Sequence, residues 1–586
     1  MDWTAHGQPR SRLYGDLYFS ADDGLAESRA VYLQGCGLPA AWASRARFTV
    51  AELGFGTGLN IAALLDLWRR EGPAAGRLHI FSVEAHPLSA AEAARALALW
   101  PELAAVAGPL IAGWPGRARG LHRVELPKFR AILDVAVLEA AEALAGWDGK
   151  ADAWFLDGFS PSLNPAMWRD EVLGLVAARS ASGARAASFT VAGQVRRGLA
   201  AAGFAVEKRP GHGRKRERLE ARLAGEPGRE TARRVAIVGA GVAGAAAAQA
   251  VRALGGEALL IEAERPGAGG SGNPAALVTP RLDAGLGLPA RLFAQAFARA
   301  VALYEQTSGS ILSRGVLQLA GEARDAQRFA KIAASDLFEP EALAMLAQAA
   351  ATERLGEAAP AALAQETALV VEPARVLAAW GGDVQQGRVA VIVRDGAAWS
   401  LRDADGAEVA RAEAVIVAAG LGSRALVADL PLQAVRGQAS WAPGVDWPGP
   451  AAAWGGYALP APEGVLFGAT HDRDDEGLEV RDADHARNLA TLGAALPALA
   501  AQLAGTPLEG RASIRAVTPD RLPLAGAAAA QGLYLLAGFG SRGFSLAPLL
   551  AEHVAALALG VASPLPLPLA ELVDPGRFLR RRGRPI

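Results

Sequence analysis

Two glycine-rich turns far apart in the chain constrain its fold most strongly. One spans Gly54–Gly58 and the other spans Gly239–Gly244. Each follows an apolar run that predicts a buried strand, and each precedes a stretch that predicts a helix. A strand, a glycine-rich turn and a helix in this order are typical of α/β domains that bind nucleotide cofactors, because glycine lets the backbone approach a ligand closely. We therefore expect an α/β protein with two cofactor turns.

The length of the chain also indicates two domains. A single hydrophobic core stops growing at about 250–300 residues, and this chain has 586. The polar segment Leu223–Arg234 contains Pro and Gly and is the expected linker. We expect one domain at residues 1–225 and a second at 226–586. The second should consist of a nucleotide-binding part at about 233–300, 410–430 and 510–586, and an inserted α+β substrate part at about 301–409 and 431–509.

Hydrophobic patterning predicts alternating strands and helices in the first domain, as in a doubly wound sheet. In the second domain the alanine-rich region 320–380 is expected to be helical, and the closing region predicts a strand, a glycine-rich turn and a long helix. Further predicted elements are strands at 47–53, 78–85, 151–159, 187–191, 204–209, 389–395, 414–420 and 464–470, and helices at 59–70 and 89–100.

The composition excludes several classes of protein. The single cysteine, Cys36, cannot form an internal disulfide or a four-cysteine zinc site, which indicates a reducing compartment. The N-terminus has no apolar signal region, and no window of about 18 residues is uninterruptedly apolar. We expect a cytoplasmic monomer with no metal and no membrane partner.

The net charge of −1 conceals an asymmetry. Residues 1–225 carry 27 Lys and Arg against 23 Asp and Glu, whereas the rest of the chain is acidic. The basic excess is concentrated in Gln194–Arg222, with nine basic and three acidic residues. Such a run is either a solvated helix face or hairpin, or a surface that binds phosphates. The phosphate-binding candidates in this run are Arg196, Arg197, Arg214, Lys215 and Arg216.

The first turn has a pattern of its own. Gly54, Gly56 and Gly58 follow Glu52 in the order E-x-G-x-G-x-G, and Glu84 ends the next predicted strand, where an acid can bind ribose hydroxyls. Together these resemble the class I S-adenosylmethionine methyltransferases. The alternative is a structural turn in some other α/β domain.

A second loop of the first domain is a candidate for chemistry. Asp157 and Phe159, in DAWFLDGFSPSLNPAMW, lie where the fourth strand of a methyltransferase fold would end. The segment is similar to the acidic–aromatic–proline loops of amine methyltransferases. Asp157 could orient an amine and accept its proton while Phe159 packs on the acceptor. The alternative for Asp157 is a helix N-cap.

The second turn meets each contextual test for a dinucleotide fingerprint. Gly239, Gly241 and Gly244 form G-x-G-x-x-G between a strand and a helix, and Glu262 ends the following strand. Both NAD and FAD use this fingerprint, but later segments resemble the D-amino-acid oxidase and glycine oxidase family. That resemblance implies FAD and adds cofactor-binding candidates, namely Ser271, Gly272, Asn273, Gly420, Gly540, Arg542 and Gly543.

The resemblance also indicates a substrate site in the second domain. Arg515, in SIRAVTPDRLPLAG, falls where the oxidase family binds a substrate carboxylate, and a guanidinium suits that task because it forms two parallel bonds. Ala516 departs from that family, which has proline there. Tyr457 is a further substrate candidate, with plain packing as the alternative.

Nearly the whole chain resembles the bifunctional tRNA 5-methylaminomethyl-2-thiouridine biosynthesis family. The runs that carry this resemblance include ELGFGTGLN, DAWFLDGFSPSLNPAMW and GFGSRGFSLAPLLAE; in GHGRKRE, His212 replaces an aromatic residue. The resemblance implies FAD-dependent removal of a carboxymethyl group from a tRNA wobble uridine, followed by S-adenosylmethionine-dependent methylation of the exposed amine. It also implies that the basic run binds tRNA. The alternative is a two-domain oxidase and methyltransferase that acts on free small amines.

Overall fold

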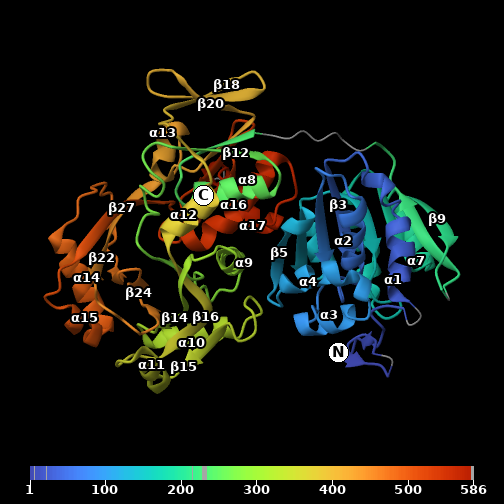
Figure 1. Cartoon of the computed structure of the whole chain (residues 1–586), viewed down its shortest axis with the longest axis horizontal. Coiled ribbons are helices and arrows are strands. Elements are labelled where there is room, and N and C mark those ends of the chain that lie inside the picture. Colours follow the sequence, from blue (N-terminus) through green and yellow to red (C-terminus); the bar gives the residue numbers. More distant parts are fainter. Residues whose placement is uncertain (6, 21–22, 214, 227–233, 583–586) are drawn as a thin grey trace. The chain divides into compact units, whose positions relative to one another are not determined.

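The computed structural model describes residues 1–5, 7–20, 23–213, 215–226 and 234–582. The chain divides into two compact units, Met1–Thr231 and Ala232–Ile586. Each unit contains its own central, mainly parallel sheet with helices packed on it (Figure 1).

The first unit is built on an eight-stranded sheet in the order β5-β6-β4-β3-β7-β8-β10-β9. The five central strands are parallel, and β5, β9 and β10 are antiparallel to their neighbours. The strands are β3 (Arg47–Leu53), β4 (Arg77–Val83), β5 (Gly120–Leu126), β6 (Ala131–Val137), β7 (Ala151–Leu156), β8 (Ser180–Ser188), β9 (Ala205–Pro210) and β10 (Glu217–Arg222).

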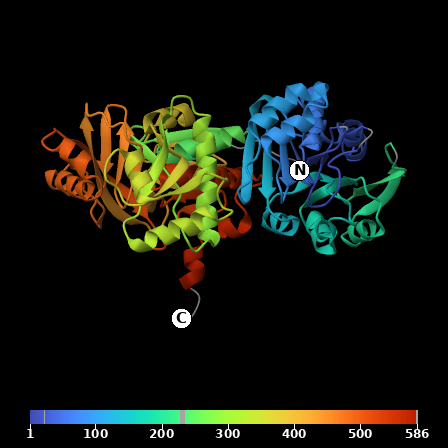
Figure 2. The ribbon, with the colours of Figure 1, turned by 90° about the horizontal axis from the view of Figure 1, so that it is seen from below.

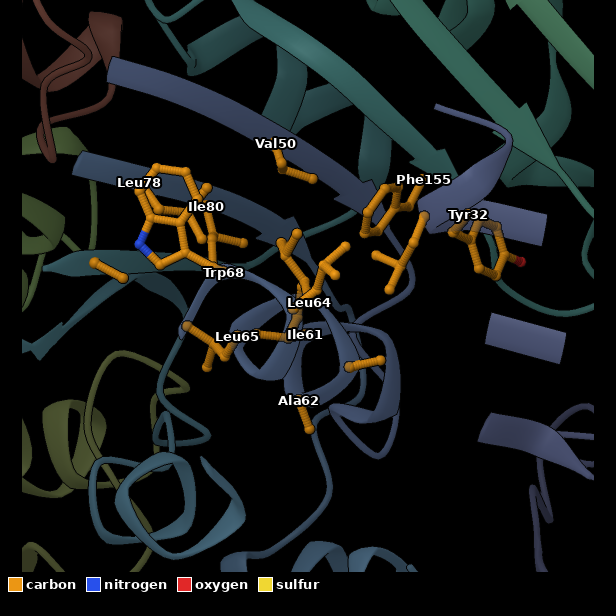
Figure 3. Packing of buried hydrophobic residues seen from close by; sticks show 14 of the residues in the cluster. Tyr32, Val50, Ile61, Ala62, Leu64, Leu65, Trp68, Leu78, Ile80 and Phe155 are labelled. Carbon is orange, nitrogen blue, oxygen red and sulfur yellow. The ribbon is translucent and has the colours of Figure 1, made fainter. Parts of the chain in front are cut away.

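The core of this unit forms where helix α2 (Leu59–Glu71) packs on the sheet (Figure 3). Ile61, Leu64, Leu65 and Trp68 are fully buried, and each such side chain contributes about 1.5–3 kcal/mol through burial. The Trp68 ring nitrogen donates to the Phe129 carbonyl at 2.9 Å, so its polar group is satisfied. The other helices of the unit include α1 (Gly24–Ser28), α3 (Ala90–Leu97), α4 (Ala104–Ala112), α5 (Ala140–Gly146), α6 (Asp170–Ala178) and α7 (Gly193–Ala201).

The strand order positions the first site. From β3 the chain proceeds outward through β4 and β6, and it then returns to the other side of β3 to form β7 and β8. The reversal lies between β3 and β7, and α/β sheets bind ligands beyond the carboxyl ends of the strands at such a point. The turn after β3 begins at Gly54, and the loop after β7 begins at Asp157.

The second unit contains a six-stranded sheet in the order β17-β12-β11-β21-β29-β28, parallel except for β28. Helices α8 (Val242–Ala253) and α16 (Gly543–Leu559) pack against each other on it. The strands are β11 (Arg234–Val238), β12 (Glu257–Glu262), β17 (Val384–Gln386), β21 (Ala414–Val417), β28 (Leu524–Ala527) and β29 (Leu533–Ala537).

A ten-stranded sheet forms the inserted part of this unit. Helices α14 (Asp482–Ala495) and α15 (Pro497–Leu503) lie beside its orange strands in Figure 2, with α14 in contact with β22 and β25. A separate three-stranded sheet comprises β18 (Val391–Asp395), β19 (Ala398–Arg402) and β20 (Glu408–Ala412). The strands of the large sheet are β13 (Ala276–Val278), β14 (Ile311–Leu319), β15 (Leu343–Leu346), β16 (Ala362–Val371), β22 (Gln433–Pro443), β23 (Ala451–Ala453), β24 (Tyr457–Ala461), β25 (Gly464–Gly468), β26 (Asp472–Arg473) and β27 (Glu509–Val517).

The alanine-rich region 320–380 is only partly helical, so that prediction was wrong in part. It contains α10 (Ala323–Ala333), α11 (Gln348–Leu355) and α12 (Pro373–Gly381), but β15 and the buried β16 lie between them. β16 pairs with β13, β14 and β15, and this tertiary pairing outweighs the helix propensity of its alanines.

The boundaries inside the second unit also differ from the expected ones. β27 was assigned to the nucleotide-binding part but pairs along its length with β22 of the inserted sheet. Conversely, β17 extends the nucleotide-binding sheet at the edge of β12, although residues 301–409 were assigned to the substrate part. Pairing over long sequence separations decides both cases.

Candidate active sites

The turn after β3 opens onto a pocket of about 390 Å³. Gly54, Gly56 and Gly58 have φ angles of +88°, +51° and +73°, in the left-handed region that favours glycine. A β-carbon on Gly54 would lie 2.9 Å from the Gly158 Cα. The loops after β3 and β7 can therefore approach this closely only with glycine at position 54.

Glu84 follows β4 and lines the same pocket. Its Oε2 accepts a hydrogen bond from the Gly56 amide at 3.0 Å, and its Oε1 accepts one from the His86 amide at 2.9 Å. Burial raises the pKa of Glu84, and these two backbone bonds oppose the rise. Because a carboxylate has about four acceptor positions, Glu84 retains capacity to bind a pair of ligand hydroxyls.

Asp157 follows β7 and lines the pocket beside the glycine turn. Its Oδ2 accepts a hydrogen bond from Asn60 Nδ2 at 2.7 Å, and its carboxylate also accepts one from the Tyr32 hydroxyl. Burial raises the pKa of Asp157, while the bonds from Tyr32 and Asn60 and the charge of Lys215 oppose the rise. Asp157 is thus a fixed carboxylate with a raised proton affinity.

Aromatic rings form one wall of the pocket. The Phe159 ring lies 4.8 Å from the Tyr14 ring and 5.1 Å from the Tyr18 ring, measured between centroids. All three residues line the pocket. The sequence indicated Phe159 but not Tyr14, Tyr18 or Tyr32, because these tyrosines reach the site through the fold. Asn60 ends the glycine-rich run ELGFGTGLN but was not predicted as a site residue.

The basic run folds into α7 and the hairpin of β9 and β10. Several of its cations are already paired, since Lys208 contacts Glu217, Arg209 contacts Glu207 and Arg218 contacts Glu220. The positive charge of the hairpin is therefore smaller than the sequence indicates.

Among the candidates for phosphate binding, Arg196, Arg197 and Arg216 are exposed and form no ion pair with any described residue. Lys215 lines the pocket, 2.9 Å from Glu27 and 4.2 Å above the centre of the Phe189 ring. Arg214 lies outside the described residues. The candidates without an ion pair therefore lie on α7 (Arg196 and Arg197) and directly before β10 (Arg216), and the paired Lys215 reaches the pocket.

In the second unit the turn after β11 is tightly packed. A β-carbon on Gly239, whose φ is +105°, would lie 2.7 Å from the Ala418 carbonyl oxygen, and one on Gly244 would overlap the Gly239 carbonyl oxygen. Glu262 Oε2 accepts a hydrogen bond from the Ala240 amide at 2.7 Å, which ties the end of β12 to the turn. These contacts match the roles that a dinucleotide fingerprint gives to its first and third glycines.

The loop from Gly267 to Asn273 lies against the start of α8. Ser271 Oγ accepts a hydrogen bond from the Val242 amide at 3.0 Å, and a β-carbon on Gly241 would lie 3.1 Å from that oxygen. Arg511 of β27 supports the loop from the other side by donating to the Ala268 carbonyl at 2.6 Å and to Asn273 Oδ1 at 3.3 Å. A β-carbon on Gly272 would lie 2.9 Å from the Arg511 guanidinium, so there is little room at that position.

Two further glycines lie beyond the ends of neighbouring parallel strands. Gly420 follows β21, Gly540 follows β29, and each has a φ of +57°. Apart from the adjoining residues of the chain, no described atom lies within 4 Å of a β-carbon built on Gly420, and among the described residues only the Val517 side chain does so at Gly540. These two turns leave open space beside the backbone at the carboxyl ends of β21 and β29, in the same sheet as β11, where an extended dinucleotide such as FAD would bind.

Arg542 and Gly543 begin α16 next to this surface. Burial lowers the pKa of Arg542 to about 10, and the charge of Arg281 adds to the effect. Arg542 Nη1 donates to the Pro280 carbonyl at 3.3 Å, and it forms no ion pair with any residue that the structure describes. A β-carbon on Gly543 would lie 3.1 Å from Val242 of α8, so this position joins the two helices closely.

Arg515 lies on β27 and is largely buried. Its Nη1 donates to the Thr470 carbonyl at 3.0 Å, and within the described ranges no carboxylate forms an ion pair with it. Burial lowers the pKa of Arg515, and Tyr457 and Asp472 oppose this shift. Burial also raises the pKa of Tyr457, and Arg515 opposes that shift. A partly buried guanidinium without a counter-ion among the described residues, close to a partly buried phenol, is suited to bind a carboxylate.

The strand that carries Arg515 is hydrogen-bonded to the turn at Gly540. The Gly540 amide donates to the Ala516 carbonyl at 2.9 Å, and Val517 forms a β-bridge with Phe539. The residue next to Arg515 is therefore hydrogen-bonded to the turn that follows β29.

Over the described ranges, no three His, Cys, Asp or Glu side chains gather as metal ligands would. No single described helix has the length and apolarity needed to cross a membrane, although the sharply bent pair Ala90–Leu97 and Pro101–Ala112 meets those criteria jointly.

Known proteins resemble both units. A family model described as an S-adenosyl-L-methionine-dependent methyltransferase matches residues 101–224, and one described as an FAD dependent oxidoreductase matches residues 234–557. A tRNA 5-methylaminomethyl-2-thiouridine biosynthesis bifunctional protein MnmC from Caulobacter vibrioides is 60% identical over 577 residues, which are 98% of this chain and 97% of the relative.

The chain belongs to the MnmC family. An MnmC protein from Maricaulis maris is 42% identical and covers 100% of this chain and 97% of its own length. The solved structure of L-proline dehydrogenase from P. horikoshii covers 60% of this chain and 99% of its own, with a TM-score of 0.51 and 18% identity, which shows a shared fold. These findings confirm the predicted family and the order of a methyltransferase domain before an FAD-dependent oxidoreductase domain.

Membership of the MnmC family also confirms the two predicted cofactors, FAD and S-adenosylmethionine, at the level of the two domains. The roles of individual residues stay predictions. The structure brings Gly54, Glu84, Asp157 and Phe159 to one pocket, and it brings Tyr457 close to Arg515. It does not bring the exposed Arg196 and Arg197 into the pocket lining.

Proposed function

We propose that this chain modifies the wobble uridine of tRNA in two steps. The second unit removes the carboxymethyl group from 5-carboxymethylaminomethyl-(2-thio)uridine, and the first unit methylates the exposed amine to give 5-methylaminomethyl-(2-thio)uridine. The observation that carries this proposal is the 60% identity, over nearly the full length, to a protein named for the biosynthesis of that nucleoside.

Arg515 supports the first step. The proposed substrate carries a glycine unit, and its carboxylate would pair with the buried guanidinium, which has no partner carboxylate among the described residues. The C–H bond that breaks is on the carbon between the amine and the carboxylate, and bound FAD would supply the hydride acceptor. The resulting imine is split by water, so that the carboxymethyl carbons leave as an aldehyde acid and the amine stays on the base. Tyr457 would line the same site and help to exclude water from it.

Asp157 supports the second step. The amine attacks only in its neutral form, so a carboxylate that orients it and then accepts its proton assists the displacement. S-adenosylmethionine, when bound, supplies the methyl group. The raised pKa of Asp157 makes it a better proton acceptor than an exposed aspartate. Phe159, with Tyr14 and Tyr18, offers aromatic surface for the extruded base.

The exposed cations support tRNA as the carrier of this amine. Arg196, Arg197 and Arg216 would bind phosphates, while Lys215 lies in the pocket itself. A loop nucleotide leaves its stack at low cost, so the wobble base can reach either pocket. We expect the protein to act as a monomer in the cytoplasm, and a sedimentation measurement with and without tRNA tests the oligomeric state.

Nucleoside analysis tests the proposal. A tRNA that carries 5-carboxymethylaminomethyl-(2-thio)uridine is incubated with the purified, flavin-loaded protein, with and without S-adenosylmethionine. We expect 5-aminomethyl-(2-thio)uridine without the methyl donor and the methylated nucleoside with it. The rival function, oxidation and methylation of free small amines, predicts turnover of glycine-like amines and no tRNA shift even at low salt. These two results together would contradict the proposal and support the rival function.

A further inference from the structure

One side-chain amide joins two buried carboxylates beneath the methyltransferase pocket. Asn60, in the first turn of α2, donates from Nδ2 to Asp157 Oδ2 at 2.7 Å and to Glu52 Oε1 at 3.1 Å. The Asn60 amide has two N–H groups, so each carboxyl receives one. The Asn60 amide that orients Asp157 is therefore also held by Glu52.

Among the described residues, Glu52 is linked to the pocket lining through its hydrogen bond to Asn60. Asn60 and Asp157 line the pocket, whereas Glu52 and Ser82 do not. Glu52 is 1% exposed and Ser82 is 0% exposed, so solvent does not reach this end of the arrangement. The other Glu52 oxygen, Oε2, lies 2.6 Å from Ser82 Oγ. Both carboxyl oxygens are thus engaged by the protein.

The surroundings of Glu52 disfavour a charge on it. The groups that face it are Ser82, Asn60, Asp157 and Glu84, and no described cation forms an ion pair with it. Burial raises the pKa of Glu52 well above its ordinary value, and the charges of Asp157 and Glu84 add to the rise. An ionised Glu52 would be an uncompensated charge next to Asp157, which is costly in a buried site.

The hydrogen bonds are compatible with a neutral acid. A protonated carboxyl has one carbonyl oxygen that accepts and one hydroxyl that donates. Oε1 accepts from Asn60. Oε2 accepts from the Ser82 hydroxyl when Glu52 is ionised, and in the neutral acid it would carry the proton and donate it to Ser82 Oγ. Only Asp157 then carries a negative charge at the Asn60 amide.

We propose that Glu52 is a positioning residue of the methyl-transfer site, which in its neutral form anchors Asn60 so that Asn60 holds the Asp157 carboxylate toward the pocket. This inference rests on the proposed function of Asp157 but concerns a residue that touches neither the substrate nor the cofactor. It predicts that neutrality and hydrogen bonding matter at position 52 and that negative charge does not.

Two substitutions separate shape from charge. Glu52→Gln keeps a carbonyl oxygen for Asn60 and offers an N–H to Ser82. Glu52→Ala removes both bonds. We expect kcat for methyl transfer to fall about 10–100-fold in Glu52→Ala, by analogy with the loss seen when groups that orient metal ligands are removed. The KM values should change much less. Glu52→Gln should restore kcat to within about threefold of the natural enzyme, well inside that range.

The pH profile adds a readout that a general structural role would not change. Without its anchor, Asn60 stabilises ionised Asp157 less, so the acid limb of the methylation profile should move to higher pH in Glu52→Ala and return in Glu52→Gln. Asn60→Ala removes the bond to Asp157 itself, so the double change should lose no more than Asn60→Ala alone if Glu52 acts only through Asn60. Additive losses would overturn the inference, as would a loss of activity or a raised KM for S-adenosylmethionine in Glu52→Gln.

An infrared measurement tests the proton on Glu52 independently of methylation. The natural protein near neutral pH should show the carbonyl band of a protonated carboxyl that disappears in Glu52→Gln and persists in Asp157→Asn. The inference is overturned if the natural protein lacks this band, or if the band persists in Glu52→Gln. This result does not depend on whether tRNA is the substrate. Retained oxidation of substrate by each variant, which the other unit performs, checks that the chain has folded and loaded flavin.

Discussion

The guanidinium of Arg515 lies directly over the Cα atom of Gly437. A β-carbon at position 437 would fall well inside van der Waals contact of both terminal nitrogens of Arg515. Gly437 lies on β22, opposite Ser513 of β27, so the two strands place the glycine beneath the arginine. The absence of a side chain at position 437 creates the space that Arg515 occupies.

Gly437→Ala should therefore displace Arg515 without changing its charge. We expect kcat/KM for oxidation to fall about tenfold or more, because the added methyl group forces a shift of roughly the size that misaligns a bound substrate. Steady-state oxidation at several substrate concentrations measures this effect. Methylation of tRNA that already carries the aminomethyl group should be unchanged, and an equal loss of both activities would indicate unfolding rather than displacement.

Arg515→Ala should abolish oxidation and leave methylation intact. Removing one partner of a buried charged pair costs about 2–5 kcal/mol, which corresponds to a loss of about thirtyfold to several thousandfold in kcat/KM. Arg515→Lys keeps the charge but not the planar fork, and it should recover only part of the loss. Flavin absorption of each variant serves as the control for cofactor loading.

Asp157→Asn should have the opposite effect and abolish methylation while oxidation continues. Loss of a proton acceptor in the transition state lowers rates by about 10²–10⁴-fold. In the natural protein, burial raises the pKa of Asp157, so methylation should decline on acidification at a higher pH than an ordinary aspartate would produce. The pH dependence of methylation measures this limb; a profile without any acid limb would contradict an ionised Asp157.

Charge removal on α7 tests the tRNA surface. Arg196→Gln with Arg197→Gln should weaken tRNA binding and reduce the slope of log affinity against log salt by about two, since each phosphate contact contributes about one. Arg209→Gln is the matched control because the charge of Arg209 is already offset by Glu207. Equal effects of both changes would mean that only net charge matters.

His553 couples the stability of the second unit to pH. It is buried in α16, and burial lowers the pKa of His553 from 6.5 to about 4. Between these two pH values the unfolded chain binds a proton that the folded chain does not bind. The free energy of unfolding should therefore fall as the pH drops through this window, by about 3 kcal/mol in total.

Denaturant titrations followed by flavin fluorescence measure this dependence across that window. His553→Asn should show a smaller decline with falling pH, whatever its absolute stability. His86→Asn, a change at an exposed histidine of the other unit, should keep the full decline. An identical decline in His553→Asn would place the acid sensitivity elsewhere.

Local sequence determined the parts of the fold that form around the two glycine turns. The strands and helices flanking Gly54 and Gly239 lie where the patterning predicts them, because turn, strand and helix signals there agree within about 30 residues. The antiparallel strand β5 was not predicted, and β16 was predicted as helix. Both depend on partners that only the folded chain provides.

The candidate sites show the same division. Asp157 and Glu84 could be found because acids at strand ends have a known meaning. Tyr14 and Asn60 could not, since a tyrosine before the first glycine turn and an asparagine within a helix have many ordinary explanations. The basic run misled in part, because Lys208 and Arg218 pair with glutamates that the charge count did not place opposite them.

The link between Ala516 and Gly540 has a practical consequence for enzyme redesign. Arg515 and the turn after β29 belong to one hydrogen-bonded piece of backbone. Substitutions in β27 that aim to change which carboxylate substrates bind would therefore also disturb the surroundings of the flavin and alter the flavin's reactivity. New substrate preferences are better sought on β24, where Tyr457 reaches Arg515 from a separate hairpin.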